Sequence, residues 1–267
     1  MVTLKKILVP IVDRANYGRL KPLLIEMNES DSIDLEIVCS GTTVLSRFGN
    51  VADEIRASGL NVIEKIYMEL EGGTNLSMTK SIGLGIIEFS NVFNKCKPDA
   101  VLLIGDRYEA VSAAVAAVYM RIPIIHLQGG EISGSIDEYT RHAITKYAEL
   151  HFPATEKARQ NIIRMGEPIE NVHNCGCPVA DVVNEALMLS PAEIKLNGLG
   201  AKVDLSKSYN LVLYHPDTLN LNDELYVEKI IETILDLGMQ TIWLWPNIDA
   251  GSDNISKLLR RNRERNA

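Results

Sequence analysis

The chain has 267 residues, a hydrophobic content of 46% and a net charge of −8, an ordinary composition for a globular protein of two α/β lobes. The acidic balance argues against a general nucleic-acid-binding protein, although one arginine at a helix N-terminus could still bind a small anion. No apolar run reaches the roughly 20 residues that a membrane helix needs. The first residues also lack the apolar segment of a signal peptide.

The four cysteines indicate a reducing compartment. Cys39, Cys96, Cys175 and Cys177 do not have the spacing of a disulfide framework. Cys175-Gly-Cys177 is tighter than the usual Cys-x-x-Cys site, and no second pair accompanies it. We therefore expect four reduced thiols, a cytoplasmic protein and no zinc site.

Short apolar runs alternate with helical patterns along most of the chain. The runs predict buried strands at residues 6–12, 33–40, 61–68, 99–105, 122–127, 150–154 and 172–176. Helical spacing predicts helices at residues 20–27, 51–58, 77–94, 108–120, from 137, 156–165 and 178–189. This alternation predicts a mostly parallel sheet with helices on both faces.

A polar segment divides the chain into two predicted lobes. Residues 190–208 have no firm apolar period, so we expect a linker between a first lobe of residues 1–189 and a second of residues 209–267. The second lobe has only two predicted strands, at residues 209–214 and 240–246. Because a doubly wound lobe needs more strands than that, we expect the second lobe to be incomplete.

Polar residues follow three of the predicted strands of the first lobe. Arg14 lies in the turn after the first strand, where a helix N-terminus and a guanidinium would together favour an anion. The alternative is that Arg14 only neutralises Asp13. Asp106 directly follows the predicted strand at residues 99–105. It is expected to lie at the carboxyl edge of the sheet, to cap the next helix, or to do both.

The richest of these segments follows residues 122–127. It runs from His126 to Lys146 and contains three glycines together with Glu131, Asp137, Glu138, Arg141 and His142. An acidic, glycine-rich turn between a strand and a helix is where open α/β sheets place their chemistry. The alternative is an ordinary polar loop in front of a capped helix, since loops are generally polar.

Taken in chain order, these segments resemble the UDP-N-acetylglucosamine 2-epimerases, most closely their hydrolysing branch. The matching segments are Arg14-Ala-Asn-Tyr17, Lys80-Ser-Ile-Gly-Leu-Gly85, Gly105-Asp-Arg107, Gly129-Gly-Glu131, Ser135-Ile-Asp137, Arg141-His-Ala-Ile-Thr-Lys146, His215-Pro216 and Pro246-Asn-Ile-Asp-Ala-Gly-Ser252. The resemblance implies two facing Rossmann-like lobes of the glycosyltransferase-B type, with a UDP-sugar between them.

The resemblance also implies a reaction. UDP is eliminated across carbons 1 and 2 to give a 2-acetamidoglucal, and hydration then gives N-acetylmannosamine, as in sialic-acid-type sugar biosynthesis. This chemistry implies no metal, no nicotinamide and no other cofactor, and the family implies a homo-oligomer. The same chemistry on UDP-2,4-diacetamido-2,4,6-trideoxyglucose is one alternative. An inactive homologue with a binding or structural role is another.

Carried over by motif, Asp106 and Asp137 match acid/base residues of the family. His215 matches a histidine near the diphosphate, and Arg14 the arginine on the phosphate side. Glu131 is a further candidate for the catalytic base. The remaining candidates for substrate binding are Tyr17, Arg107, His126, Gln128 and His142.

The sequence departs from the family pattern in three places. Gln128 stands where a catalytic glutamate is usual, and glutamine can hydrogen-bond but cannot take a proton. The base is then displaced to Glu131 or Asp137, or the Gln128 amide meets a second acetamido group of a different sugar, or activity is impaired. Asn16 replaces the usual aspartate. The family also continues past residue 267, with a turn for the phosphates and a glutamate for the ribose.

Overall fold

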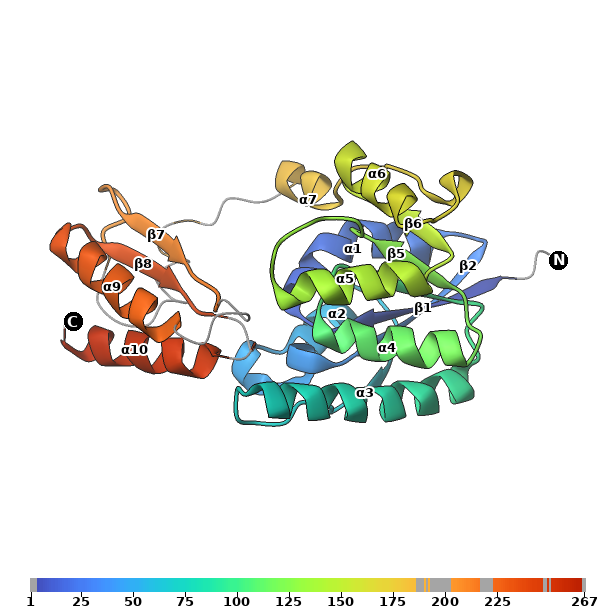
Figure 1. Ribbon diagram of the computed structural model, residues 1–267, viewed down its shortest axis with the longest axis horizontal. Coiled ribbons are helices and arrows are strands. Elements are labelled where there is room, and N and C mark those ends of the chain that lie inside the picture. Colours follow the sequence, from blue (N-terminus) through green and yellow to red (C-terminus); the bar gives the residue numbers. More distant parts are fainter. Residues whose placement is uncertain are drawn as a thin grey trace. The chain divides into compact units, whose positions relative to one another are not determined.

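The computed structural model describes residues 4–185, 190, 192, 203–216, 223–246, 249 and 251–265 (Figure 1). Contacts between Cα atoms divide the chain into two compact units. The first comprises residues 1–70 and 79–185, and the second residues 71–78 and 186–267. Each unit has its own sheet. The predicted lobe limits stay a prediction, and most of the expected linker at 190–208 lies outside the described residues.

A six-stranded parallel sheet forms the centre of the first unit, in the order β3-β2-β1-β4-β5-β6. The strands are β1 (Lys5–Ile11), β2 (Ile33–Cys39), β3 (Val62–Lys65), β4 (Ala100–Ile104), β5 (Ile124–Leu127) and β6 (Leu150–Phe152). The strand order reverses between β1 and β4. In open parallel sheets ligands bind at such a switch point, beyond the carboxyl ends of the strands.

Helices cover both faces of this sheet, which confirms the predicted α/β arrangement. They are α1 (Arg14–Glu29), α2 (Val51–Ala57), α3 (Asn75–Cys96), α4 (Tyr108–Tyr119), α5 (Ile136–Tyr147), α6 (Glu156–Arg164) and α7 (Val179–Glu185), with short 3-10 turns η1 (Gly41–Val44), η2 (Ser46–Phe48) and η3 (Ile169–Asn171). Alternate residues of each strand enter two separate cores. One core contains α1 and α2, and the other contains α3, α4 and α5 (Figure 1). Burial on both faces explains why the central strands β4 and β5 are almost continuously apolar.

The predicted strand at residues 172–176 is wrong in extent. Only Val172 pairs with the sheet, through an isolated bridge to His151 and a hydrogen bond from His173 N to His151 O of 2.9 Å. Val172 is buried, whereas residues 173–176 are largely exposed. Because residues 173–176 have no apolar face to pack on the sheet, they form a loop instead of a strand.

In the described part of the second unit, two parallel strands pair and helices pack on them. They are β7 (Asn210–Leu213), β8 (Thr241–Leu244), α9 (Asp223–Asp236) and α10 (Ser252–Arg265). Val227, Ile231 and Ile255 form a small core, while Leu211 and Leu213 are exposed on β7. Within the described ranges, no helix of either unit is long and apolar enough to cross a membrane.

Candidate active site

The first-unit candidates gather at the carboxyl edge of the sheet, as predicted. Arg14 follows β1, Asp106 follows β4, and residues 128–135 follow β5. β1, β4 and β5 are neighbours in the sheet. Parallel strands end at one edge, so three turns that are distant in sequence lie together at the switch point.

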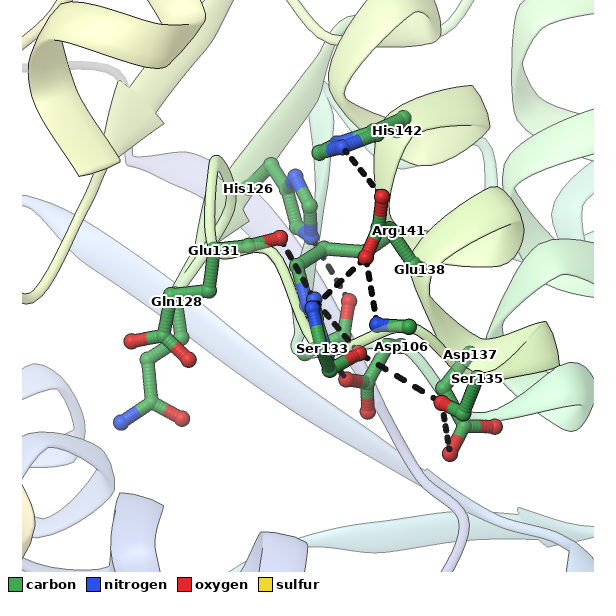
Figure 2. Close-up of polar contacts among 12 residues, drawn as sticks. Asp106, His126, Gln128, Glu131, Ser133, Ser135, Asp137, Glu138, Arg141 and His142 are labelled. Atoms are coloured by element: carbon green, nitrogen blue, oxygen red, sulfur yellow. Dashed lines mark hydrogen bonds and ion pairs between the residues drawn. The ribbon is translucent and has the colours of Figure 1, made fainter. Parts of the chain in front are cut away.

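The centre of this edge is an ion pair between Asp106 and Arg141. Arg141 lies on α5, is almost completely buried, and its Nη2 donates to Asp106 Oδ2 (Figure 2). Its Nη1 donates to Glu131 O at 2.6 Å and to Ser133 Oγ at 3.3 Å. One guanidinium therefore fixes both the Asp106 carboxylate and the loop after β5. Such charge-assisted hydrogen bonds are among the strongest in proteins.

Sequence reasoning did not include Arg141 among the site residues, although the Arg141–Lys146 segment was part of the resemblance. Asp106 and Arg141 are 35 positions apart, so no local pattern joins them. The available signal was the position of Arg141 one turn beyond Asp137, which places both on the same side of a helix.

Glu138 holds the same loop from the first turn of α5. Its Oε2 accepts hydrogen bonds from the backbone N–H groups of Ser133 at 2.6 Å and Gly134 at 2.7 Å. These bonds lower the pKa of the Glu138 carboxyl. His142 Nε2 lies 3.9 Å from Glu138 Oε1, so the His142 side chain faces the carboxylate that holds the loop after β5 (Figure 2).

The other two acidic candidates lie differently. Asp137 is at the start of α5 and accepts a hydrogen bond of 3.4 Å from Ser135 Oγ. Glu131 is exposed, and Figure 2 shows its side chain directed away from the Asp106–Arg141 pair, whereas its carbonyl faces Arg141. The structure therefore brings the backbone carbonyl of Glu131, rather than its carboxylate, to Arg141.

Gln128 is committed to partners within the chain. It is 8% exposed, and its backbone has the left-handed φ of 58°. Arg19 Nη1 donates to its Oε1 at 2.8 Å, and its Nε2 donates to Cys177 Sγ at 3.0 Å. Arg19 lies on α1, which packs on the face of the sheet opposite to α5. Both ends of the amide thus have a partner within the chain, and its expected contact with a sugar acetamido group stays a prediction.

His126 is buried within the first unit and is not exposed to a ligand. It is 0% exposed, with Nε2 2.8 Å from Gly105 O and Nδ1 3.1 Å from Thr145 Oγ1. A carbonyl can only accept, so Nε2 bears the proton and Nδ1 accepts from the hydroxyl. Burial lowers the pKa of His126 to about 4. A Cβ on Gly129 would lie 2.9 Å from Nδ1, so only glycine lets the following turn pack on this ring.

The residues after β1 show why Arg14 is available. Asp13 accepts from Asn16 N at 2.6 Å and caps α1, while its other oxygen lies 3.7 Å from Arg107 Nε. Arg14 is 67% exposed in its side chain and lies 3.7 Å from Glu54. The alternative that Arg14 only neutralises Asp13 is therefore wrong.

Tyr17 and Arg107 are both buried, which argues against direct contact with a ligand. Tyr17 packs in the α1 core and its hydroxyl lies 2.7 Å from Ser58 Oγ. Arg107 donates to both carboxylate oxygens of Glu109, each at 3.1 Å.

Two further matching segments meet in the second unit. His215 is exposed and follows β7, and Gly251 follows β8. A Cβ on Gly251 would lie 3.2 Å from Pro216 Cβ, so the two segments are in close contact. Among the described residues of the whole chain, no group of three or more His, Cys, Asp and Glu side chains could hold a metal ion.

Comparison with known proteins adds independent evidence. A family model described as UDP-N-acetylglucosamine 2-epimerase matches residues 25–266. The chain is 35% identical over 258 residues to a UDP-N,N'-diacetylbacillosamine 2-epimerase (hydrolyzing) of Legionella pneumophila, covering 96% of this chain and 68% of that protein. It is 32% identical to a GDP/UDP-N,N'-diacetylbacillosamine 2-epimerase (hydrolyzing) of Campylobacter jejuni, covering 86% and 59%. It is 29% identical to a UDP-N-acetylglucosamine 2-epimerase of Neisseria meningitidis, covering 94% and 65%.

Among solved structures, a UDP-GlcNAc 2-epimerase from Neisseria meningitidis bound to UDP-GlcNAc matches with a TM-score of 0.76 at 18% identity, covering 96% of this chain and 70% of that one. At this identity the likeness is one of fold, and it confirms the predicted α/β class of the glycosyltransferase-B type. The chain spans 59–68% of the length of the three sequence relatives.

Proposed function

The chain belongs to the UDP-N-acetylglucosamine 2-epimerase family, and we propose that it is a hydrolysing UDP-sugar 2-epimerase. The main structural support is the Asp106 carboxylate held by Arg141 at the switch point of the first-unit sheet. Two of its relatives that are more than 30% identical are named as hydrolysing epimerases, which supports the hydrolysing form of the reaction.

The proposed reaction balances without a cofactor. A carboxylate removes the proton from carbon 2 while the bond from carbon 1 to the UDP oxygen breaks, which gives the 2-acetamidoglucal and UDP. Water then adds its hydroxyl to carbon 1, and a proton returns to carbon 2 from the opposite face. The net change is one UDP-sugar and one water converted to UDP and the free 2-epimer.

This reaction needs acid/base groups near carbon 2 and help for the departing diphosphate. We assign Asp106 to carbon 2, because its carboxylate is fixed in orientation by Arg141. We assign Asp137 to the attacking water, with Glu131 as the alternative base if the loop rearranges when substrate binds. Arg14 has an exposed side chain in the first turn of α1, and we assign it, with His215, to the diphosphate.

For the sugar we propose UDP-N,N'-diacetylbacillosamine, which is the 2,4-diacetamido-2,4,6-trideoxyglucose of the sequence-based alternative. The relatives named for it are 35% and 32% identical to this chain. UDP-N-acetylglucosamine, the first expectation from sequence, is the second candidate. A relative named for it is 29% identical, so the difference is small.

The test is an incubation with each UDP-sugar in deuterated buffer. We expect UDP and free sugar in equal amounts, with the 2-epimer configuration and one deuterium at carbon 2. Comparing kcat/KM on the two sugars decides the substrate. No UDP release from either sugar, or a product without deuterium, would overturn the proposal. If calorimetric titration then also finds no UDP binding, the non-catalytic alternative gains support.

We also propose that the chain forms a homo-oligomer and works in the cytoplasm, as the family resemblance and the unpaired cysteines suggest. Light scattering coupled to size-exclusion chromatography measures the oligomeric state directly. A single species at the mass of one chain would reject the oligomer.

A further inference from the structure

A buried ion network connects the turns that follow β1 and β4. Arg107 lies between two carboxylates, because its Nε and Nη2 donate to the two oxygens of Glu109 at 3.1 Å each and its Nε is 3.7 Å from Asp13 Oδ2. The three residues come from two separate places: Asp13 caps α1, whereas Arg107 and Glu109 lie at the N-terminus of α4. The network therefore joins two strands of the sheet at the switch point.

The turn after β2 packs on the same carboxylate. A Cβ on Gly41 would lie 3.1 Å from Glu109 Oε1 and 2.5 Å from the carbonyl of Val12, and Gly41 has a left-handed φ of 57°. Only glycine fits there. Tyr108, the residue before Glu109, contacts the segment after β3, since its hydroxyl donates to Glu69 Oε2 at 2.6 Å. The turns after β1, β2 and β4 thus meet at or beside Glu109.

Stability alone does not explain such an arrangement. Glu109 is 0% exposed, and this burial raises the pKa of its carboxyl, with Arg107 opposing the shift. Removing two charges from water is costly, and well-packed apolar residues of similar size often serve stability equally well. What the ion network provides, and apolar packing does not, is a fixed direction for each hydrogen bond.

The groups that this network fixes are those of the proposed reaction. Arg107 directly follows Asp106, and Asp13 directly precedes Arg14. Asp13 also caps α1 through Asn16 N at 2.6 Å, so it sets where that helix begins. Arg141 holds the Asp106 carboxylate, and Arg107 anchors the adjoining backbone.

We propose that Asp13, Arg107 and Glu109 form a positioning network that fixes Asp106 relative to the N-terminus of α1. Glu109 is the positioning residue, since it orients Arg107 and does not touch substrate. The inference rests on the proposed function. Elimination requires the group at carbon 2 and the cation at the diphosphate to be at a set separation, and small misplacements of such groups are costly in rate.

The first test is Glu109→Gln, which keeps the shape of the side chain and replaces one oxygen that accepts from Arg107 by a donating NH2 group. We expect kcat to fall roughly 10- to 100-fold while KM stays within about 3-fold. Hydrogen exchange should increase together in residues 13–17 and 105–108, because the shared anchor of the two turns is weakened. Glu156→Gln on α6, an exposed residue outside the network, is the matched control and should change neither.

The second test separates positioning from simple stabilisation. The double variant Arg107→Met/Glu109→Met replaces the pair by apolar side chains, so the fold should regain most of any stability lost in Glu109→Gln. In our proposal kcat remains low in the double variant. Recovery of kcat together with stability would show a merely structural pair and overturn the inference.

The outcomes also distinguish this inference from the proposed function. A wild-type protein that releases no UDP from either sugar would reject the function, while hydrogen exchange still reports on the network. If exchange in Glu109→Gln increases only within α4, the two turns are not coupled, and the inference fails even in an active enzyme.

Discussion

Replacing His126 with phenylalanine is expected to lower the free energy of unfolding of the first unit by about 2–6 kcal/mol. In the structure the ring bonds Gly105 O at 2.8 Å and Thr145 Oγ1 at 3.1 Å. Phenylalanine keeps most of the ring volume but bonds neither group. Each buried polar group left without a partner costs about 1–3 kcal/mol, and a whole domain is stabilised by only about 5–15 kcal/mol.

The same substitution should change how stability depends on pH. Burial lowers the pKa of His126 from 6.5 to about 4. The unfolded chain takes up this proton near pH 6.5 and the folded chain only near pH 4, so the free energy of unfolding falls as pH decreases through that range. The shift corresponds to about 3 kcal/mol as an order of magnitude. In His126→Phe this contribution is absent and the decline is shallower. His151, whose pKa is also lowered by burial, contributes in both proteins.

The measurement is urea unfolding at pH 7.5 and pH 5, followed by circular dichroism. Both tryptophans, Trp243 and Trp245, belong to the second unit, so their fluorescence is an internal control that should not shift. Thr145→Val is the matched variant, and a double-mutant cycle should give a coupling of about 0.5–1.5 kcal/mol with His126→Phe. A loss below about 1 kcal/mol, or an unchanged slope with pH, would refute the reasoning.

Three further substitutions test other contacts of the first unit. Asp106→Asn should abolish UDP release from either sugar while thermal unfolding stays near that of the wild type; wild-type rates would reject its acid/base role. Gln128→Ala should cost about 1–3 kcal/mol in urea unfolding, because Arg19 and Cys177 lose a buried partner, and an unchanged midpoint would contradict the hydrogen bonds. Gly130→Ala should destabilise by more than about 2 kcal/mol, since its Cβ would lie 2.3 Å from the Ala158 carbonyl at a φ of 82°. Its matched control is Gly18→Ala, which has open space in α1 and should stabilise by about 0.5–1 kcal/mol; equal effects of the two would disprove the steric argument.

Sequence alone determined the order of the elements and the edge where polar residues gather. Apolar periodicity is a local property of the chain. The strands that end before Arg14 and Asp106 could therefore be located from the pattern of adjacent residues in the sequence. Because parallel strands end at one edge, the common location of these residues followed without coordinates. Where the local apolar pattern was weak, as at residues 172–176, the prediction of a strand failed.

Only the tertiary structure decided where the side chains of the site point. Alternation along β5 places Ile125 and Leu127 toward α1 and His126 toward α5. Continued alternation would place the Gln128 side chain on the same face of the sheet as His126. Its left-handed backbone instead brings the amide to Arg19, which is 109 positions away. A single unusual φ of this kind is not visible in an apolar pattern.

The same limit applies to the charged residues. The segment Gly105-Asp-Arg107 gave no sign that Asp106 pairs with Arg141 on α5 while Arg107 turns inward to Glu109. Which of two adjacent polar side chains is buried depends on the partners that the folded chain brings to each. Arg141 reaches Asp106 from α5, and Asp13 reaches Arg107 from the turn after β1, so these distances exist only once the strands have paired.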